Sequence, residues 1–289
     1  MEQTLVIEGQ KVRNIIFPFD LDSKGDDVKP ITKTNIDALT PKSAFILDNV
    51  LSPTECKYII DRGEEMGFDE LAHYIKKYRN NSRVLVKSYS LSSLIFERIK
   101  QFLPSELDIS DSTPYLDDGR RARKHLHGKW KLNQVNELWR LCKYQDGGAF
   151  ASHYDGFYER DADNRSYLTF MIYLSGGIAG GCTRFLDPKD DKTVLASVEP
   201  KEGRILVFTH NIWHDGETVL PGGNQKYIMR TDVMYTRVNP SSSKEMLENE
   251  RLARELAREA GEMEKTDPNI AVSLYKRAFK LFPDLESEF

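Results

Sequence analysis

The chain has 289 residues, of which 39% are hydrophobic and 30% charged, a composition typical of a folded globular protein rather than a disordered one. Its net charge of −4 excludes a general electrostatic attraction to nucleic acids or anionic membranes. No stretch approaches the roughly 18 apolar residues of a membrane helix. Three scattered cysteines and the lack of a secretory leader predict a cytoplasmic or nuclear protein.

The first part of the chain predicts a lead-in, a strand and a helix. Residues 1–42 are polar and predict an irregular segment with at most one strand. Residues 43–52 (SAFILDNVLS) are typical of a short buried strand. A helix is expected to follow, because Ser52 is a good N-cap and Glu55 completes a capping box. Its expected end is Gly67.

A second helix and a basic segment come next. Apolar residues recur at helical spacing within 91–107, and the pattern stops at Pro104. Residues 108–131 predict a long irregular stretch. Its basic residues are Arg120, Arg121, Arg123, Lys124, Lys129 and Lys131. This basic run suits either an attraction for acidic peptide or nucleic acid, or a plain solvated loop.

The middle of the chain has the texture of an all-β domain. Short apolar runs are separated by glycine-rich turns, and we expect strands at 138–144, 167–175, 182–187, 193–200, 204–210 and 226–237. Many short strands with regular turns favour a sandwich or barrel of the jelly-roll type.

The chain ends in a predicted helical hairpin, residues 239–289. Ser242 and Glu245 form a capping box for its first helix, and Asp267 caps its second. The hairpin resembles a single tetratricopeptide-like helix pair, which is too short for a solenoid. We expect it to pack on the β domain, to support a homodimer or to contact a partner.

Two similar fragments, ASHYDGF and NIWHDGE, suggest a metal site. In a strand, residues i and i+2 project to the same face, so His153 and Asp155 can reach one ion together. His214 is a candidate third ligand, and His210 competes with it because both follow the apolar run RILVF. Two imidazoles and a carboxylate bind Fe(II) and leave coordination positions open. The alternative is a chance pattern of surface histidines.

Five segments, in order over residues 43–237, resemble the 2-oxoglutarate- and Fe(II)-dependent dioxygenases of the prolyl 4-hydroxylase-like branch. They are FILDNVLSPTECKYIIDRGEEMGF, YQDGGAFASHYDG, YLTFMIYLSGGIAGGCTRFLD, VEPKEGRILVFTHNIWHDGETV and KYIMRTDVMY. The resemblance implies a mainly β catalytic domain over 43–238, a double-stranded β-helix (jelly-roll, cupin-like barrel) with flanking helices.

The resemblance also implies the ligands and cosubstrates. His153, Asp155 and His214 match the iron ligands, since the tail GxxV that follows the distal histidine in the family follows His214 here. The cofactor is Fe(II), the cosubstrates are 2-oxoglutarate and O2, and ascorbate is a candidate reductant. The far carboxylate of 2-oxoglutarate needs a cation, and both Lys226 and Arg230, on one strand face, are candidates.

Other residues are assigned to the site by their place in these motifs. Tyr173 matches a position whose hydroxyl supports the far carboxylate, and Tyr144 matches the tyrosine before the His-x-Asp segment; either is also explained as a core aromatic residue. Asn136, Arg140 and Thr183 are candidates to line the substrate opening.

The implied reaction is hydroxylation of a C–H bond, with succinate and CO2 as co-products. The substrate expected first is a prolyl residue in a polypeptide. Two other functions stay open. One is an oxygenase or demethylase of a nucleic-acid base or small molecule, which the net charge disfavours for nucleic acid. The other is a non-catalytic barrel that serves as a binding module.

Overall fold

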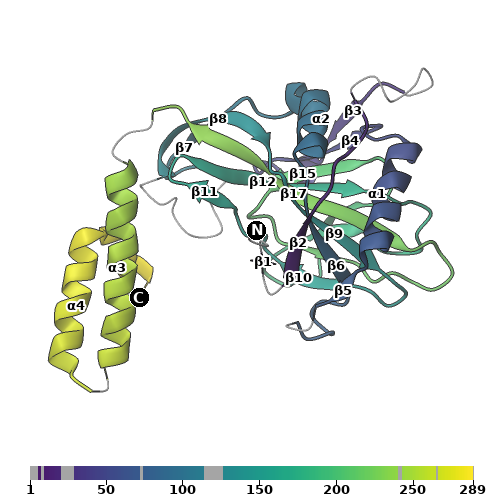
Figure 1. Cartoon of the computed structure of the whole chain (residues 1–289). Helices are drawn as coiled ribbons and strands as arrows, with labels where there is room; N and C mark the ends of the chain where they lie inside the picture. Colours follow the sequence, from purple (N-terminus) through teal and green to yellow (C-terminus); the bar gives the residue numbers. More distant parts are fainter. Residues whose placement is uncertain are drawn as a thin grey trace. The chain divides into compact units, whose positions relative to one another are not determined.

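The computed structural model of the chain describes residues 6–7, 10–20, 29–71, 74–113, 126–239, 243–264 and 266–288 (Figure 1). The chain divides into two compact units. The first comprises residues 1–105, 132–158 and 166–235, and the second comprises 106–131, 159–165 and 236–289. Both the candidate metal ligands and the predicted cosubstrate residues belong to the first unit.

A large mixed sheet is the main element of the first unit. Its strands follow the order β1 (Val6–Ile7), β2 (Gln10–Asn14), β6 (Ser82–Lys87), β9 (Leu138–Tyr144), β17 (Lys226–Arg237), β12 (Asn164–Tyr173), β15 (Ile205–Thr209), β4 (Ala44–Asp48) and β3 (Thr32–Asn35). The short β5 (Asp69–Glu70) adds to β6. Strands β2 and β6 run parallel, whereas β6–β9, β9–β17 and β12–β15 are antiparallel. The order has two ends, so the described strands do not close into a barrel.

A smaller sheet faces the large one. It contains β10 (Phe150–His153), β16 (His214–Gly216), β13 (Thr183–Leu186) and β14 (Val194–Val198), in that order. The core lies between the two sheets, because Phe185 of the small sheet packs with Phe208 and Tyr173 of the large one. Two stacked sheets with such a core are consistent with a jelly roll.

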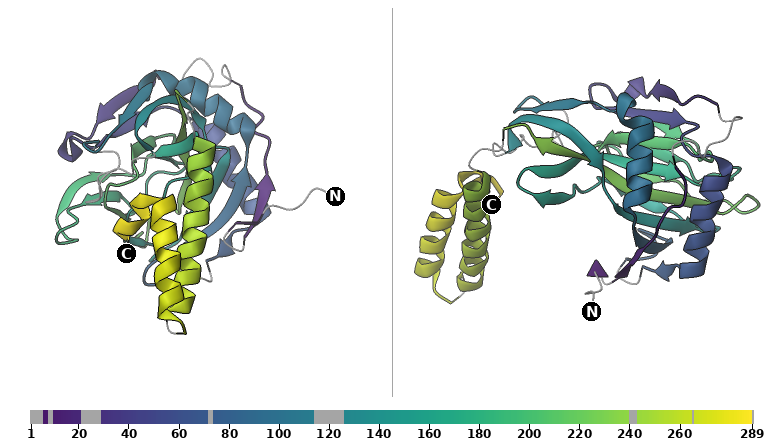
Figure 2. Two further views of the ribbon diagram at one scale, coloured as in Figure 1. Left: turned by 90° about the vertical axis from the view of Figure 1, so that its left-hand side faces the viewer. Right: turned by 45° about the horizontal axis from the view of Figure 1, so that its top comes forward.

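Helices cover the outer face of the large sheet (Figures 1 and 2). Helix α1 (Pro53–Met66) packs so closely on β9 that a Cβ on Gly63 would lie 2.6 Å from Leu141. Helix α2 (Tyr89–Ile99) is joined to the same strand by a hydrogen bond of 2.9 Å from Trp139 Nε1 to Ser92 Oγ. Side chains alternate along β9, so Arg140, Cys142 and Tyr144 point to the opposite face, toward the smaller sheet. Short 3-10 helices lie at Asp37–Leu39 and Lys100–Phe102.

The second unit contains two strand pairings and the C-terminal hairpin. Strand β7 (Glu106–Ile109) pairs with residues 128–131 of β8 (Gly128–Val135), and β11 (Glu159–Asp161) pairs with the start of β12. Helices α3 (Ser243–Met263) and α4 (Pro268–Leu281) lie side by side (Figure 2) and are followed by a 3-10 helix, Pro283–Glu288. Their shared core includes Ala253, Ala257 and Ala260 of α3 and Leu274 and Ala278 of α4.

The observed elements confirm most of the expected ones. The capping box of α1 is present and the helix ends at Gly67; Asp267 caps α4 through Asn269 N and Ile270 N. All six predicted strands of the middle region exist with ends shifted by up to three residues. The proposed cap of α3, Ser242, lies outside the described residues.

The helix expected within 91–107 is confirmed with shifted ends, since α2 spans Tyr89–Ile99 and the 3-10 helix Lys100–Phe102 follows it up to the region of Pro104. Two expectations were wrong. The N-terminal segment holds the strands β1, β2 and β3 instead of one, because each pairs with a longer strand despite its polar composition. Of the basic run, Lys129 and Lys131 are exposed residues of β8 rather than of a loop, and its arginines and Lys124 lie outside the described residues.

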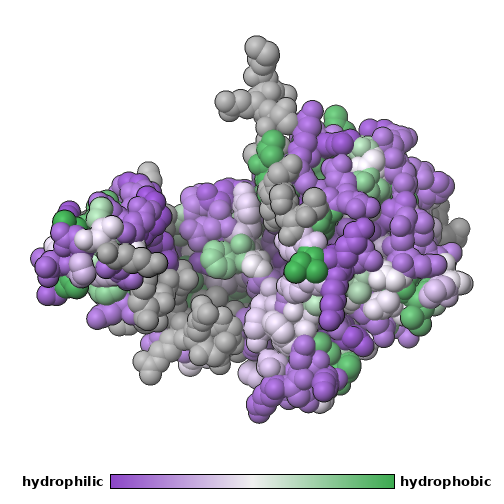
Figure 3. Space-filling view, turned by 90° about the horizontal axis from the view of Figure 1, so that it is seen from below, coloured by the Kyte–Doolittle hydropathy of each residue, from purple (hydrophilic) through white to green (hydrophobic). Residues whose placement is uncertain are grey.

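Within the described ranges, no helix is both long enough and apolar enough to cross a bilayer. The face drawn in Figure 3 is mostly hydrophilic, and its hydrophobic residues form small separate patches.

Candidate metal centre

Three candidate ligands meet at one end of the smaller sheet. His153 ends β10, His214 begins β16, and the pairing of these strands places the two histidines opposite each other. Asp155 follows β10 by two residues. Its two carboxylate oxygens lie 3.6 Å from Nε2 of His153 and 3.6 Å from Nε2 of His214. All three ligand atoms lie within 4.8 Å of one another.

Hydrogen bonds orient both imidazoles for metal binding. The Nδ1 atom of His153 lies 2.8 Å from the carbonyl of Ala151, and Nδ1 of His214 lies 2.8 Å from that of Ile212. A carbonyl only accepts, so each Nδ1 carries the proton and each Nε2 presents a lone pair. Burial lowers the pKa of His214 to about 4, which keeps this imidazole neutral, the form that binds a metal.

The surroundings of Asp155 keep its carboxylate ionised. Burial by itself opposes ionisation, but Arg230, 3.1 Å from Oδ1, outweighs it and holds the pKa of Asp155 well below its usual range. Thr169 donates a hydrogen bond of 2.7 Å to Oδ2. Both oxygens therefore have fixed partners, which orient the carboxylate toward the histidines.

His210, the competing candidate for the third ligand, is bonded to two hydroxyl groups and not grouped with the ligands. Its Nδ1 is 2.9 Å from the hydroxyl of Thr169 and its Nε2 is 2.9 Å from that of Ser166. The structure therefore groups His214, and not His210, with His153 and Asp155. The acid next to His214, Asp215, is engaged by Arg184 at 3.0 Å and is not part of the group.

This donor set fits an iron ion. Two neutral imidazole nitrogens and one carboxylate, grouped on one side of a cavity, are the ligands of a facial Fe(II) site with open positions. The imidazoles are packed by aromatic rings, since Phe150 stacks on His153 at 3.7 Å between ring centres and Phe208 meets His214 at 4.8 Å. These rings shield the ligands from bulk water.

The open side faces a cavity of about 420 Å³ between the two sheets. Lys226 lies in its wall, 2% exposed, opposite Tyr144 in the β17–β9 pairing. Its ammonium is 4.9 Å from the centre of the Tyr144 ring, and no carboxylate of the described part of the chain lies within 4.0 Å of it. Burial lowers the pKa of Lys226 to about 8.

The two candidate cations thus differ in their partners. Arg230 lies 3.1 Å from Asp155 and 3.6 Å from Asp232, so its charge is balanced inside the protein. The charge of Lys226 has no such partner among the described residues. A buried charge without a partner is costly, and a bound anion removes that cost.

The remaining predicted residues have unequal positions. Thr183 and Arg140 line the cavity. Tyr173 is buried behind Thr183, to which its hydroxyl donates a hydrogen bond of 2.7 Å. Asn136 is not among the lining residues; it is 1% exposed and its side chain accepts a hydrogen bond from Leu138 N in the turn before β9.

Sequence reasoning missed several residues at this site. Thr169 bonds to the candidate ligand Asp155, and Arg79 lies over the ring of Phe150, which stacks on His153. Each is a single polar residue without a motif around it. One weak indication was available for Thr169. It shares a face of β12 with Met171 and Tyr173, and Tyr173 was itself a predicted site residue.

Comparison with known proteins agrees with this geometry. Residues 139–231 match the family model described as the 2OG-Fe(II) oxygenase superfamily, and this segment contains all three candidate ligands and Lys226. No match was found among curated proteins.

Solved structures of prolyl hydroxylases are also similar to the chain. The viral collagen prolyl hydroxylase of Paramecium bursaria Chlorella virus 1, solved with 2OG, has 21% identity and a TM-score of 0.40, with 67% of this chain and 96% of that one covered. The Pseudomonas putida prolyl-4-hydroxylase has 16% identity and a TM-score of 0.42, with coverages of 71% and 97%. A Trichoplax adhaerens prolyl hydroxylase, solved with a peptide fragment of hypoxia inducible factor, has 16% identity and a TM-score of 0.45, with coverages of 70% and 86%.

The family match confirms the resemblance that the sequence motifs indicate. The matched segment, residues 139–231, thus resembles oxygenases described by 2OG and Fe(II), and it contains the His-Asp-His group that fits an iron ion.

Proposed function

We propose that the chain is a dioxygenase that uses Fe(II), 2-oxoglutarate and O2 to hydroxylate a C–H bond, with a prolyl residue in a polypeptide as the substrate. The observation that carries this proposal is the sharing of one cavity by the His153–Asp155–His214 group and the ammonium of Lys226, which has no carboxylate partner among the described residues. A cavity with a metal site and a cation suits a dicarboxylate that chelates the metal at one end and pairs with the cation at the other.

Each residue has a role in this proposal. His153, Asp155 and His214 hold the iron, and Lys226 binds the far carboxylate of 2-oxoglutarate. Thr183 assists it, because its oxygen already accepts a hydrogen bond from Tyr173 and its own proton is left to donate into the cavity. Tyr144 packs against the ammonium and keeps it in position.

When bound, iron and 2-oxoglutarate supply the oxidising chemistry: one oxygen atom of O2 enters the substrate C–H bond, the other enters succinate, and CO2 leaves. The protein positions the reactants and excludes water. Phe150 and Phe208 cover the imidazoles, and Asp155 stays ionised through Arg230 and Thr169. None of these side chains has to act as a nucleophile.

A rim of aromatic residues favours an apolar substrate ring at the opening. Tyr78, Tyr154 and Phe157 line the cavity and are respectively 39%, 40% and 53% exposed. Exposed aromatic faces can pack against an apolar ring without burying a polar group, and the pyrrolidine ring of proline is such a ring. A prolyl side chain offers such a ring and an unactivated C–H bond.

The experiment is succinate release from 2-oxoglutarate with Fe(II) and ascorbate, comparing the intact protein with the His153→Ala and Asp155→Ala variants. His127→Ala is the matched control, because His127 lies in the second unit beside Asp111. We expect turnover only in the intact protein and the control. Equal background in all four proteins would contradict an oxygenase.

Mass spectrometry of proline-containing peptides then tests the substrate. The expected result is a mass gain of one oxygen atom on a prolyl residue. Oxidised nucleosides or small molecules with unmodified peptides would refute the prolyl substrate while retaining the dioxygenase.

A further inference from the structure

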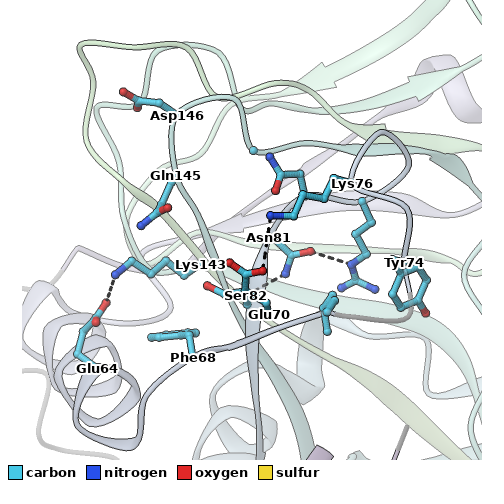
Figure 4. Close-up of a pocket in the computed structure, with 14 residues that line it drawn as sticks. Glu64, Phe68, Glu70, Tyr74, Lys76, Asn81, Ser82, Lys143, Gln145 and Asp146 are labelled. Atoms are coloured by element: carbon cyan, nitrogen blue, oxygen red, sulfur yellow. Dashed lines mark hydrogen bonds and ion pairs between the residues drawn. The ribbon is translucent and has the colours of Figure 1, made fainter. Parts of the chain in front are cut away.

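Arg79 stands between the metal cavity and a second pocket. The second pocket has a volume of about 490 Å³ and is drawn in Figure 4. Arg79 and Tyr74 line both spaces. Figure 4 shows Lys143, Gln145 and Asp146, from the end of β9 and the turn after it, on one side of this pocket and Tyr74 on the other. A chain that leaves the metal cavity past Arg79 therefore enters a preformed space.

The guanidinium of Arg79 is held in place by neutral groups. Its Nε donates to Asn81 Oδ1 at 2.8 Å, and Nη2 lies 3.9 Å from Cys142 Sγ. Its guanidinium carbon lies 4.3 Å from the ring centre of Phe150, the ring that stacks on His153. No carboxylate within the described ranges comes within 4.0 Å of it, whereas Arg230 and Arg184 have carboxylates at 3.1 and 2.5 Å. Arg79 is thus a fixed cation without a carboxylate partner among the described residues.

Most of the charged side chains that line the metal cavity are cationic. Five cationic side chains line it, Arg79, Arg83, Arg140, Lys226 and Arg230, against the carboxylates of Asp155 and Asp215. Some of these charges are balanced within the protein, since Asp232 pairs with Arg230 and Arg184 pairs with both Asp215 and Glu217.

The second pocket argues against a polyanion as the substrate. Three exposed carboxylates line it, those of Glu64, Glu70 and Asp146, together with three cations, so it lacks the excess of positive charge that binds a phosphate backbone. Glu64 and Glu70 pair with lysines, at 2.8 Å for Lys143 and 3.5 Å for Lys76. The amide of Gln145 has no hydrogen-bond partner in the described structure and suits a peptide group. This lining favours a polypeptide of mixed polarity.

We propose that Arg79 binds an acidic side chain of the polypeptide substrate, an aspartate or glutamate flanking the residue that is oxidised, while the chain beyond it occupies the second pocket. This proposal rests on the proposed function and narrows its substrate class. A carboxylate at this point supplies the partner that Arg79 lacks in the described part of the chain, and the guanidinium offers it two parallel donors.

The test uses the full chain and matched peptide sets that differ only beside a central proline, with Asp or Glu, with Asn or Gln, or with Lys. The readouts are incorporated oxygen and kcat/KM for each set. We expect acidic peptides to be preferred over their amide counterparts by about tenfold or more. Arg79→Gln should abolish this preference, and Arg79→Lys should retain part of it.

The preference is a ratio measured within one variant, so a general loss of activity or folding does not mimic the result. Arg62→Gln is the control, because Arg62 is a half-exposed residue of α1 paired with Glu65. Equal use of acidic and amide peptides by the intact protein would overturn the proposal. An unchanged preference in Arg79→Gln, or a raised KM for 2-oxoglutarate as its sole effect, would also overturn it. Absence of 2-oxoglutarate turnover with every peptide would instead refute the proposed function.

Discussion

Lys226 and Tyr144 face each other across β17 and β9, with the lysine ammonium 4.9 Å from the centre of the tyrosine ring. The ring holds a buried cation that has no carboxylate within 4.0 Å in the described part of the chain. Arg230, two strand steps further, is already paired with Asp155 and Asp232. This difference assigns distinct expected roles to two residues that sequence alone left equivalent.

We predict that Lys226→Met raises the KM for 2-oxoglutarate by about 10- to 100-fold, since a charge-assisted contact contributes about 1.5–3 kcal/mol. Methionine keeps the length and the apolar stem, so the fold should be retained. Steady-state kinetics of succinate release give the KM. Lys226→Arg is the matched control and should restore most of the affinity. A larger KM effect from Arg230→Met than from Lys226→Met would reverse the assignment.

The pKa of Lys226 predicts how 2-oxoglutarate binding depends on pH. Burial lowers this pKa from 10.5 to about 8, so the unliganded protein loses the ammonium as pH rises through 8. We expect the affinity for 2-oxoglutarate, measured by calorimetry at several pH values, to fall from about pH 7.5 to about pH 9.5. Lys226→Arg should show little change over the same range. Parallel pH profiles in the two proteins would contradict the role of Lys226.

The lowered pKa of Lys226 also makes the stability of the protein depend on pH. The unfolded chain keeps Lys226 protonated up to its ordinary pKa of 10.5, whereas the folded protein releases the proton near 8. Between these values the unfolded state binds more protons, so the contribution of this residue to the free energy of unfolding increases with pH. The cost of burying the charge is present in full below pH 8.

Thr169 links Asp155 to His210, and we predict that it supports metal affinity. Its single hydroxyl proton goes to Asp155 Oδ2, so Nδ1 of His210 must donate to the same oxygen. Thr169→Val keeps the shape and removes both bonds. Fe(II) or Mn(II) affinity, measured by calorimetry without 2-oxoglutarate, should fall about 10- to 100-fold.

Thr236→Val provides the comparison, because the Thr236 hydroxyl bonds Asn164 in the second unit. We expect it to leave metal affinity unchanged. Equal metal affinity in the Thr169 and Thr236 variants would show that the carboxylate needs no such support.

The sequence was sufficient to predict that His153, Asp155 and His214 lie together, because their motifs are short. His153 and Asp155 are two residues apart, and His214 precedes a short tail of the family motif. The strands that hold them were not predicted. Strand β10 has no fully buried side chain and β16 has three residues, so neither shows an alternation of apolar and polar positions. These strands form because they pair with each other and with β13.

Contacts between distant parts of the chain were beyond sequence reasoning. Alternation along 226–237 places Lys226 and Arg230 on one face, but only the positions of Asp155 and Asp232 show which cation is already paired. Arg79 reaches the site through Phe150, far along the chain, and no motif surrounds it. Its contact therefore required the tertiary structure.

A buried ion pair between helices α1 and α2 gives the last prediction. Glu55 accepts hydrogen bonds of 2.8 and 3.0 Å from Arg98, and the two side chains are 0% and 4% exposed. Glu55→Ala leaves the Arg98 charge buried without this partner and removes the capping bond to Ser52 N, so it should lower the free energy of unfolding by about 3–5 kcal/mol. Asp61→Ala, which breaks the exposed pair with Lys57 on the same helix, should cost less than about 1 kcal/mol. Urea denaturation followed by circular dichroism measures both, and similar midpoints for the two variants would show that the buried pair adds nothing to stability.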